Sequence, residues 1–362
     1  MTRKVLVLGG DGIGPEVTRQ GVRVLSLMAG RHGLDLSLEE GLIGGASIEV
    51  HGEPLCEATL AATKEADAVL FGAAGDPKYD HEDFYRQPGK GLLKLRRELK
   101  LFANLRPVKV FPGAEDASPL KPERIAGADL LIVRELIGGI YFGEPRGRRE
   151  EDGRKFALNT MIYSEEEVER IVRFAFGLAR GRVGAGRGRL TSVDKGNALE
   201  VGRFWRETAT RIGLEFPEIP LNHLYVDNAA MQIIRDPRQF DTLVMGNMFG
   251  DILSDTAANL SGSLGMLPSA SIGERHALYE PCHGSAPDIA GADQANPIAS
   301  VLSVGMMLHH TFGLPESEEA IHHAVDAVLR THRTTEMMAE GKTPVGCAEM
   351  GDLIVRQLEE AV

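Results

Sequence analysis

Two aspartates stand four positions apart in the segment GNMFGDILSD, which runs from residue 246 to 255. If the segment is helical, Asp251 and Asp255 share one face, and like charges at that spacing destabilise a helix by roughly 0.2–0.5 kcal/mol. A divalent cation between them would offset this repulsion, and Mg²⁺ or Mn²⁺ takes oxygen ligands of this kind. The acids would also be favourable near a helix N-terminus without any metal, because the helix dipole attracts negative charge there. The spacing alone leaves both interpretations open.

Charged residues stand at the carboxyl ends of several apolar runs. Arg134 follows DLLIV, Lys195 closes LTSVD, Asp227 follows HLYV, and Asp251 comes shortly after DTLVM. In α/β sheets, ligands bind outside the carboxyl ends of the strands. These four placements predict that the side chains converge on one cleft, and they favour the metal site.

A basic window lies on an otherwise acidic chain. Residues 90–109 carry seven lysines and arginines against one acid, whereas the whole chain has a net charge of -12. The window is either a solvated helix face or an anion site, and Arg96, inside a leucine stripe, is either a snorkelling or a ligand-binding side chain. With Arg106 and Arg134 it offers three guanidinium groups, each able to bind a carboxylate through two hydrogen bonds. A dicarboxylic acid beside a divalent metal is the simplest ligand for this set.

These side chains need a framework that positions them, and the chain predicts an α/β one. Apolar strand-like runs such as KVLVL and DAVLF alternate with stretches of helical period. One helix is predicted after Pro15, with an apolar stripe from Val17 to Met28. Another is predicted from Ser164, which forms a capping box with Glu167.

The first strand and turn, VLVLGGDGIGPE, invite interpretation as a dinucleotide fingerprint. The pattern fails, because a GxGxxG motif begun at Gly10 needs glycine at position 15, where proline stands. A tight strand-to-helix turn is the favoured interpretation. The length of 362 residues predicts about two domains, and the proline-rich passage 106–122 is typical of a crossing between them.

Composition excludes several classes of protein. The net charge argues against nucleic acid as a partner, because phosphate binding needs a basic surface. The apolar runs are far shorter than a bilayer span, and the N-terminus does not match a secretory signal, so we expect a cytoplasmic protein with no membrane partner. Cys56, Cys282 and Cys347 are odd in number and widely spaced, which predicts reduced thiols.

Longer motifs resemble a known family. The segments GDGIGPE, VRELIGGIYFGEPRG, VDKGNALEVGRFWR, YVDNAAM, GNMFGDILSD and EPCHGSAPDIAG resemble the isocitrate/isopropylmalate dehydrogenase family of metal-dependent β-decarboxylating dehydrogenases, over essentially the whole chain. The resemblance implies a two-domain α/β fold distinct from the Rossmann fold. The first, cofactor-side domain would combine residues 1–101 and 262–362. The second, residues 102–261, would carry the metal ligands, the catalytic residues and the contact of a homodimer.

The resemblance also implies roles for the residues already singled out. Asp251 and Asp255 would bind Mg²⁺ or Mn²⁺ together with Asp227 of the partner subunit, so that the active sites are shared. Lys195, also from the partner, would be the general base, and Tyr141 would protonate the enol carbon. The expected substrate-binding residues are Leu92, Leu93, Arg96, Arg106, Arg134 and Asp227.

For the cofactor, the resemblance assigns the loop HGSAPDIAG to the adenosine half of NAD. A carboxylate at Asp288 can accept from ribose hydroxyls and repels the additional phosphate of NADP, which predicts NAD. Without the family, His283 would more often be structural than a ligand. The expected cofactor-binding residues are Glu280, His283, Gly284, Ser285, Ala286, Pro287, Asp288 and Asn296.

The implied reaction is oxidative decarboxylation of (2R,3S)-3-isopropylmalate with NAD to 4-methyl-2-oxopentanoate, CO₂ and NADH, in leucine biosynthesis. Leu92 and Leu93 offer an apolar wall for an isopropyl group, but one methylene's contact contributes only about 1–3 kcal/mol. D-malate or tartrate dehydrogenation therefore stays open, and a non-catalytic organic-acid binding protein is a further alternative. Gly89 and Lys90 depart from an acidic residue common in relatives, Cys282 replaces an aliphatic one, and the 183–188 loop is assigned no function.

Overall fold

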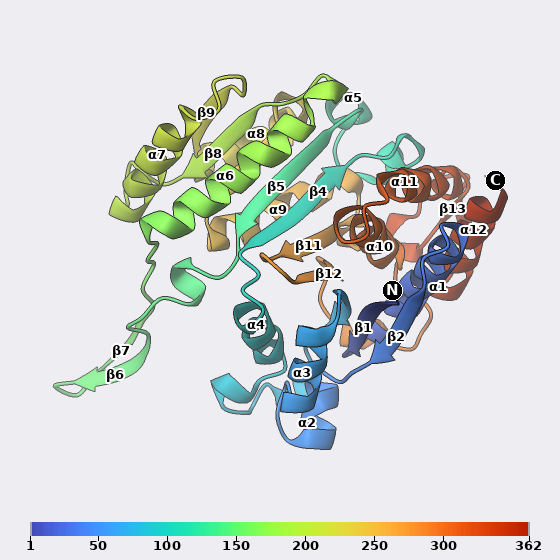
Figure 1. Ribbon diagram of the computed structural model, residues 1–362, viewed down its shortest axis with the longest axis horizontal. Helices are drawn as coiled ribbons and strands as arrows, with labels where there is room; N and C mark the ends of the chain where they lie inside the picture. The colour runs from blue at the N-terminus through green and yellow to red at the C-terminus, as the bar shows by residue number, and fades with distance from the viewer. Residues whose placement is uncertain (1, 361–362) are drawn as a thin grey trace. The chain divides into compact units, whose positions relative to one another are not determined.

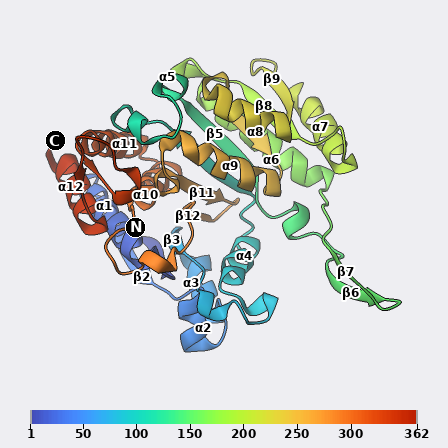
Figure 2. The same cartoon turned by 180° about the vertical axis from the view of Figure 1, so that it is seen from behind.

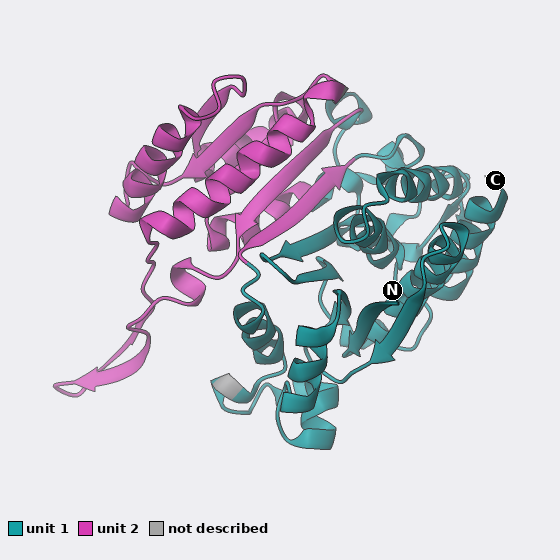
Figure 3. Cartoon of the chain, in the orientation of Figure 1, with its two compact units in different colours: residues 1–101, 110–126, 258–362 teal, residues 102–109, 127–257 magenta. Residues whose placement is uncertain are grey.

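The computed structural model describes residues 2–360, apart from the side chains of residues 85 and 185. The chain forms two compact units, coloured separately in Figure 3. Unit 1 contains residues 1–101, 110–126 and 258–362, and unit 2 contains residues 102–109 and 127–257. The sequence-based division assigned 110–126 and 258–261 to the second domain, whereas these residues pack with unit 1. Both chain ends thus belong to one unit.

Unit 1 is built on a mainly parallel sheet with strand order β2-β1-β3-β12-β11. Only the β11–β12 pair of this sheet is antiparallel among the pairings described. A small parallel pair, β13 with β14, lies outside it. The strands are β1 (Arg3–Gly10), β2 (Leu36–Glu40), β3 (Ala68–Ala73), β11 (Pro268–Ile272), β12 (Ala277–Pro281), β13 (His332–Arg333) and β14 (Thr343–Pro344).

Helix α10 lies in the core of unit 1, and its residues Ile298 to Leu308 are all buried. It packs against α1, α11 and the β11–β12 pair (Figure 1). The predicted stripe of α1 is confirmed, because Val17, Gly21, Val24, Leu25 and Met28 are buried. The helices are α1 (Gly14–Arg31), α2 (Gly45–His51), α3 (Glu57–Glu65), α4 (Gly89–Glu98), α5 (Pro122–Ile125), α10 (Ile298–His310), α11 (Pro315–Leu329) and α12 (Cys347–Glu360).

The main strands of unit 2 follow the order β4-β5-β10-β8-β9. β4 pairs antiparallel with β5, and the remaining neighbours are parallel. Helices α6 and α7 cover one face, and α8 and α9 cover the opposite face, as the two views show (Figures 1 and 2). The strands are β4 (Ala103–Lys109), β5 (Asp129–Glu135), β8 (Leu190–Asp194), β9 (Leu221–Tyr225) and β10 (Thr242–Met245). The helices are α6 (Glu165–Gly181), α7 (Glu200–Gly213), α8 (Val226–Arg235) and α9 (Asn247–Ser261), the last of which runs on into unit 1.

One local feature of unit 2 follows directly from sequence. The predicted capping box is confirmed at the start of α6, where Ser164 and Glu167 bond reciprocally to each other's backbone. A hairpin of β6 (Gly147–Glu151) and β7 (Arg154–Leu158) extends away from the sheet (Figure 1).

The three cysteines are free thiols, as predicted. Among the described residues, no helix is both long and apolar enough to cross a membrane.

Candidate active site

The parallel strands of unit 2 place the predicted charged residues along one edge of the sheet. Arg134 lies at the end of β5, Lys195 directly follows β8, Asp227 follows β9, and Asp251 follows β10. Because β5, β10, β8 and β9 are parallel neighbours, all four residues stand at their carboxyl ends. The strand-end prediction is confirmed.

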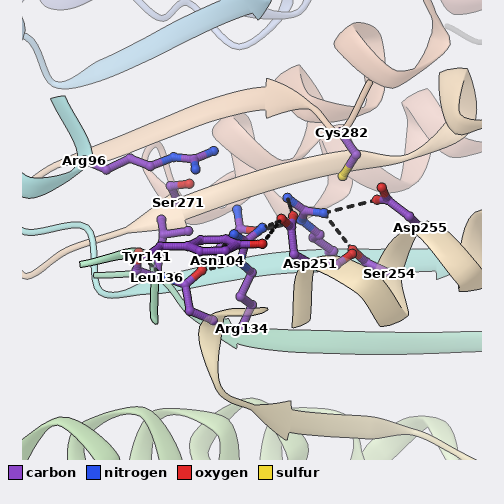
Figure 4. A network of polar contacts seen from close by, with 12 residues as sticks. Arg96, Asn104, Arg134, Leu136, Tyr141, Asp251, Ser254, Asp255, Ser271 and Cys282 are labelled. Carbon is purple, nitrogen blue, oxygen red and sulfur yellow. Dashed lines mark hydrogen bonds and ion pairs between the residues drawn. The ribbon is translucent and has the colours of Figure 1, made fainter. Parts of the chain in front are cut away.

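The first cluster forms around Asp251, in the second turn of α9 (Figure 4). Its carboxylate accepts from Arg134 Nη1, and Tyr141 donates its hydroxyl to Asp251 Oδ2 at 3.0 Å. Arg106 reaches both acids: Nη2 lies 3.4 Å from Asp251 Oδ1, and Nη1 lies 3.5 Å from Asp255 Oδ1. Two carboxylates and two guanidinium groups therefore form one network within unit 2.

This network corrects one step of the sequence argument. The spacing of Asp251 and Asp255 indicated a repulsion that a metal ion would have to relieve. Instead, Arg106 contacts both carboxylates, and Arg134 contacts the first of them. The protein supplies its own counter-charge, so repulsion between the aspartates is no longer a reason to require a metal. The donor set itself still fits a hard divalent ion, because both acids offer oxygen ligands from one helix face.

Burial raises the pKa of two side chains in the cluster, Asp255 and Tyr141. Arg106 and Arg134 are buried, whereas the Asp255 side chain is 59% exposed. Partial burial raises the pKa of Asp255 above its usual range, and neighbouring Asp251 raises it further while Arg106 lowers it. Burial, followed by the charge of Asp251, also raises the pKa of the Tyr141 hydroxyl. Tyr141 is therefore protonated at neutral pH and able to donate.

The second cluster is an ion pair between Lys195 and Asp227. Lys195 Nζ lies 2.9 Å from Asp227 Oδ2, and the hydrogen bond from Lys195 lowers the pKa of the exposed Asp227. The strand end before Lys195 is anchored, because Asp194 accepts from Arg206 Nε at 2.8 Å and from the backbone N–H of Gly196 at 2.7 Å. The lysine therefore extends from a fixed point on the sheet edge.

The convergence of the four strand-end residues on one cleft stays a prediction, and the ion pairs of the chain show which partner each residue takes. Over residues 2–360, no three acidic, histidine or cysteine side chains lie close enough together to hold a metal ion. Asp227 is paired with Lys195, and Asp251 is paired with arginines. The ion pairs at the strand edge thus fall into two groups, one at the ends of β8 and β9 and one around Asp251.

In unit 1, Arg96 is neither snorkelling nor solvated. It lies buried on α4 and donates from Nη2 to Glu280 Oε1 at 2.7 Å, and Glu280 is also buried. Leu92 and Leu93 lie on the same helix and are half-buried. Glu280 was expected at the cofactor and Arg96 at the substrate, and the two side chains are in direct contact.

A hollow of about 330 Å³ lies in unit 1 beside the HGSAPDIAG loop. Of the expected cofactor residues, His283, Ala286 and Asn296 line it, whereas Asp288 is exposed in the short turn Pro287–Ile289. Ser285 holds the loop against the first strand-to-helix turn, because its carbonyl accepts from the Ile13 N–H at 2.8 Å. Further lining residues, which the sequence analysis did not name, are Ile13, Ser263, Gly265, Ile289, Gln294, Ala295, Thr335 and Glu336.

The hollow combines apolar walls with the ring of His283. His283 Nε2 is buried and has no hydrogen-bond partner within the described residues. Burial lowers the pKa of His283, so the ring is neutral at physiological pH. An unmatched buried polar atom is costly, and a ligand atom that bonds to it recovers the lost hydrogen bond. The apolar walls of Ile13 and Ala286 complete a site of the usual composition.

Asp11 organises this region and was missed by the sequence analysis. Its buried carboxylate accepts three backbone N–H groups, from Gly45 at 2.9 Å, Ala46 at 2.9 Å and Gly75 at 2.8 Å. One side chain thereby ties together the loops after β1, β2 and β3. The GDGIGPE segment is thus a tight turn with a loop-binding acid, rather than a glycine-rich phosphate loop.

Glu135, the last residue of β5, carries a pH-dependent prediction. It is wholly buried and accepts from the N–H groups of Ile137 and Gly138 at 3.2 and 2.8 Å, but burial raises its pKa to about 7. A carboxyl group whose pKa is raised in the folded state stabilises the fold at pH values below its unfolded-state pKa. That stabilisation is lost as the pH rises through the folded-state pKa. We expect the free energy of unfolding of the native protein, relative to Glu135→Gln, to fall by about 2–3 kcal/mol between pH 5 and 8. Denaturant unfolding of both proteins at these pH values measures it, and parallel pH profiles would contradict it.

Comparison with known proteins was decisive for the family. The model of the family described as isocitrate/isopropylmalate dehydrogenase matches residues 4–354. The chain belongs to this family. The family assignment and the predicted non-Rossmann α/β fold are therefore confirmed.

Relatives match along nearly their whole length. The 3-isopropylmalate dehydrogenase of Chromohalobacter salexigens is 55% identical over 98% of both chains. That of Thermosynechococcus vestitus is 54% identical over 99% of both chains. Among solved structures, isocitrate dehydrogenase from Methylococcus capsulatus has a TM-score of 0.87 at 34% identity and covers 98% of this chain and 99% of its own. A β-decarboxylating dehydrogenase from Thermococcus kodakarensis has a TM-score of 0.79 at 32% identity, with 99% and 96% coverage.

Proposed function

We propose that this chain oxidises and decarboxylates (2R,3S)-3-isopropylmalate with NAD, forming 4-methyl-2-oxopentanoate, CO₂ and NADH in leucine biosynthesis. The observation that carries the proposal is the Arg106–Arg134–Asp251–Tyr141 network, which places carboxylate-binding cations, metal-binding oxygens and a proton donor within one cluster. The near-full-length identity to enzymes named 3-isopropylmalate dehydrogenase supports the same substrate.

A divalent ion would be held by Asp251 and Asp255, together with Asp227 of the partner subunit. When bound, Mg²⁺ or Mn²⁺ supplies Lewis-acid stabilisation of negative charge on the substrate oxygen. Asp251 and Asp255 carry two negative charges, and Arg106 and Arg134, which contact them, carry two positive charges. Joint binding of a dication and a dicarboxylate preserves that balance, whereas either ligand alone would leave two uncompensated charges.

Two residues bind the substrate carboxylates, and two others transfer protons. Arg106 and Arg134 hold the substrate carboxylates, and buried guanidinium groups suit this because they stay charged. Lys195, once it has released its own proton and is a free amine, would accept the hydroxyl proton of the substrate, and NAD would supply the hydride acceptor. Tyr141, protonated at neutral pH, then donates to the carbon from which CO₂ departs.

The proposal includes a homodimer with shared sites, in which the ion pair keeps Lys195 and Asp227 together. Lys195 and Asp227 of one copy would complete the Asp251 cluster of the other. The assignment of catalysis, metal ligands and dimer contact to the domain at residues 102–261, and of the cofactor to residues 1–101 with 262–362, is part of this proposal. We also propose a cytoplasmic location, consistent with the biosynthetic role.

For specificity, Leu92 and Leu93 would face the isopropyl group, and Arg96 would contact a carboxylate while Glu280 holds it in place. NAD would occupy the hollow in unit 1, with adenine between Ile13, His283, Ala286 and Asn296. Asp288, exposed in its turn, would accept from the adenosine ribose and repel a 2′-phosphate. Gly284, Ser285 and Pro287 would shape the loop.

A substrate panel tests this proposal. With Mg²⁺ present, formation of reduced cofactor is measured for 3-isopropylmalate, D-malate, tartrate and isocitrate, each with NAD and with NADP. We expect the highest kcat/KM for 3-isopropylmalate with NAD, by at least about tenfold over malate, since the isopropyl group adds several apolar methylenes' worth of contact. Preference for D-malate or tartrate would assign the alternative activity. Binding without turnover of any acid would favour an organic-acid binding protein.

A further inference from the structure

We propose that Asn247 is a positioning residue for Arg134. Asn247 fixes the plane of the Arg134 guanidinium group and determines which of its N–H groups face the ligand. Asn247 is the first residue of α9 and is 1% exposed. The inference deepens the proposed function and rests on the proposed binding of a substrate carboxylate by Arg134.

The amide of Asn247 uses its hydrogen-bonding capacity fully. Its Oδ1 accepts twice from Arg134, from Nε at 3.0 Å and from Nη2 at 2.8 Å. Its Nδ2 donates twice, to the carbonyls of Leu136 at 2.9 Å and Gly138 at 3.0 Å. An amide offers two acceptor sites and two donors, so every one is occupied. The two carbonyls on one side and the guanidinium on the other allow only one orientation of the amide.

The backbone around Asn247 is also held. Its N–H donates to the hydroxyl of Tyr163 at 2.7 Å, and the Tyr163 ring lies edge-on to Trp205 with centroids 5.4 Å apart. One turn later, Gly250 packs on the Arg134 stem so closely that an added Cβ would lie 2.6 Å from Arg134 Cβ and Cγ. The start of α9 thus forms a slot that holds both the stem and one edge of the arginine.

This arrangement directs the opposite end of the guanidinium group. Asn247 occupies the Nε and Nη2 side, and Nη1 lies at Asp251, in the network with Tyr141. A guanidinium has a rigid planar fork, so fixing one edge fixes the direction of the remaining N–H groups. A buried asparagine plays the same part for the second arginine, because Asn104 Oδ1 accepts from Arg106 Nε at 2.7 Å.

The choice of an amide, rather than a carboxylate, has an electrostatic reason. An aspartate at position 247 has nearly the same shape but would pair with Arg134 and cancel its charge toward a ligand. Because an ionised aspartate has no N–H group to donate, the carbonyls of Leu136 and Gly138 would lose the hydrogen bonds that Asn247 gives them. A neutral amide orients the guanidinium without adding a second carboxylate to the one, Asp251, that Arg134 already contacts.

The test is a double-mutant cycle in the full-length enzyme. Binding of 3-isopropylmalate is measured by calorimetry with MgCl₂ and without NAD, for the native protein, Asn247→Ala, Arg134→Ala and the double variant. We expect Asn247→Ala to weaken binding at least about tenfold in the native background and less than twofold in the Arg134→Ala background. An equal loss in both backgrounds would overturn the inference, because Asn247 would then act independently of Arg134.

Steady-state kinetics and a near-isosteric variant separate positioning from general structural damage. Asn247→Asp should raise KM for 3-isopropylmalate at least about tenfold, while KM for NAD stays within twofold. A matched control is Asn259→Asp, the same change on an exposed position of the same helix, which should leave both constants unchanged. An Asn247→Asp enzyme with native KM values would also overturn the inference. If Arg134→Ala itself binds the acid normally, the proposed role of Arg134 fails instead.

Discussion

Replacing Lys195 with alanine is expected to lower kcat by a factor of about 10² to 10⁴ while 3-isopropylmalate still binds. This is the range over which a positioned general acid or base accelerates a reaction. Lys195 lies at the carboxyl end of β8, 2.9 Å from Asp227, and the buried Asp194 beside it is fixed by Arg206. Removal of the amine deletes the proposed base without disturbing that anchor, and the exposed Asp227 is left in contact with water. Steady-state turnover, combined with substrate binding measured by calorimetry, checks the prediction.

A matched control is Lys64→Ala, which removes a lysine from a comparable ion pair, 3.0 Å from Glu98 in unit 1. It should retain native turnover. Retained turnover in Lys195→Ala would remove Lys195 as the base. Loss of substrate binding together with turnover would instead assign the lysine to binding.

Replacing Asp251 with asparagine is expected to lower kcat/KM by about 10² to 10⁴. A divalent ion held by Asp251 would stabilise the transition state by several kcal/mol, and each 1.4 kcal/mol is tenfold in rate. The change also removes the charged partner of Arg134, Arg106 and Tyr141 at once, although the amide keeps the shape of the carboxyl group. Kinetics over a range of Mg²⁺ and Mn²⁺ concentrations measure the effect.

Chelation gives the same test without mutation. Excess EDTA should abolish the activity of the native enzyme, and added Mg²⁺ or Mn²⁺ should restore it. The Asp251→Asn enzyme should need far more metal or fail to recover. Asp352→Asn, which removes a carboxylate from an exposed ion pair with Arg23, is the matched control and should keep the native metal response. Full activity in EDTA would exclude a metal role for Asp251.

Local sequence patterns predicted much of the framework, because these features are determined by short segments of the chain. The stripe on α1, the capping box on α6 and the charged residues at four strand ends all follow from helical or strand periodicity within a few residues. Two further spacing patterns of this kind indicate residues of the site. Asn104 and Arg106 stand two apart on β4, so they share a face, and Asn247 stands four residues before Asp251 on α9.

Sequence by itself determined the family, the non-Rossmann α/β architecture and the positions of the charged side chains along the chain. Only the tertiary structure decided what each charge contacts. Arg134 meets Asn247 across 113 residues of sequence, and Arg96 meets Glu280 across 184. The same packing put Arg106 beside both Asp251 and Asp255, and it kept Asp227 with Lys195 on the far strands. The physical reason is that a buried charge takes the partner that strand order and register bring within hydrogen-bonding distance, and neither periodicity nor spacing encodes that choice.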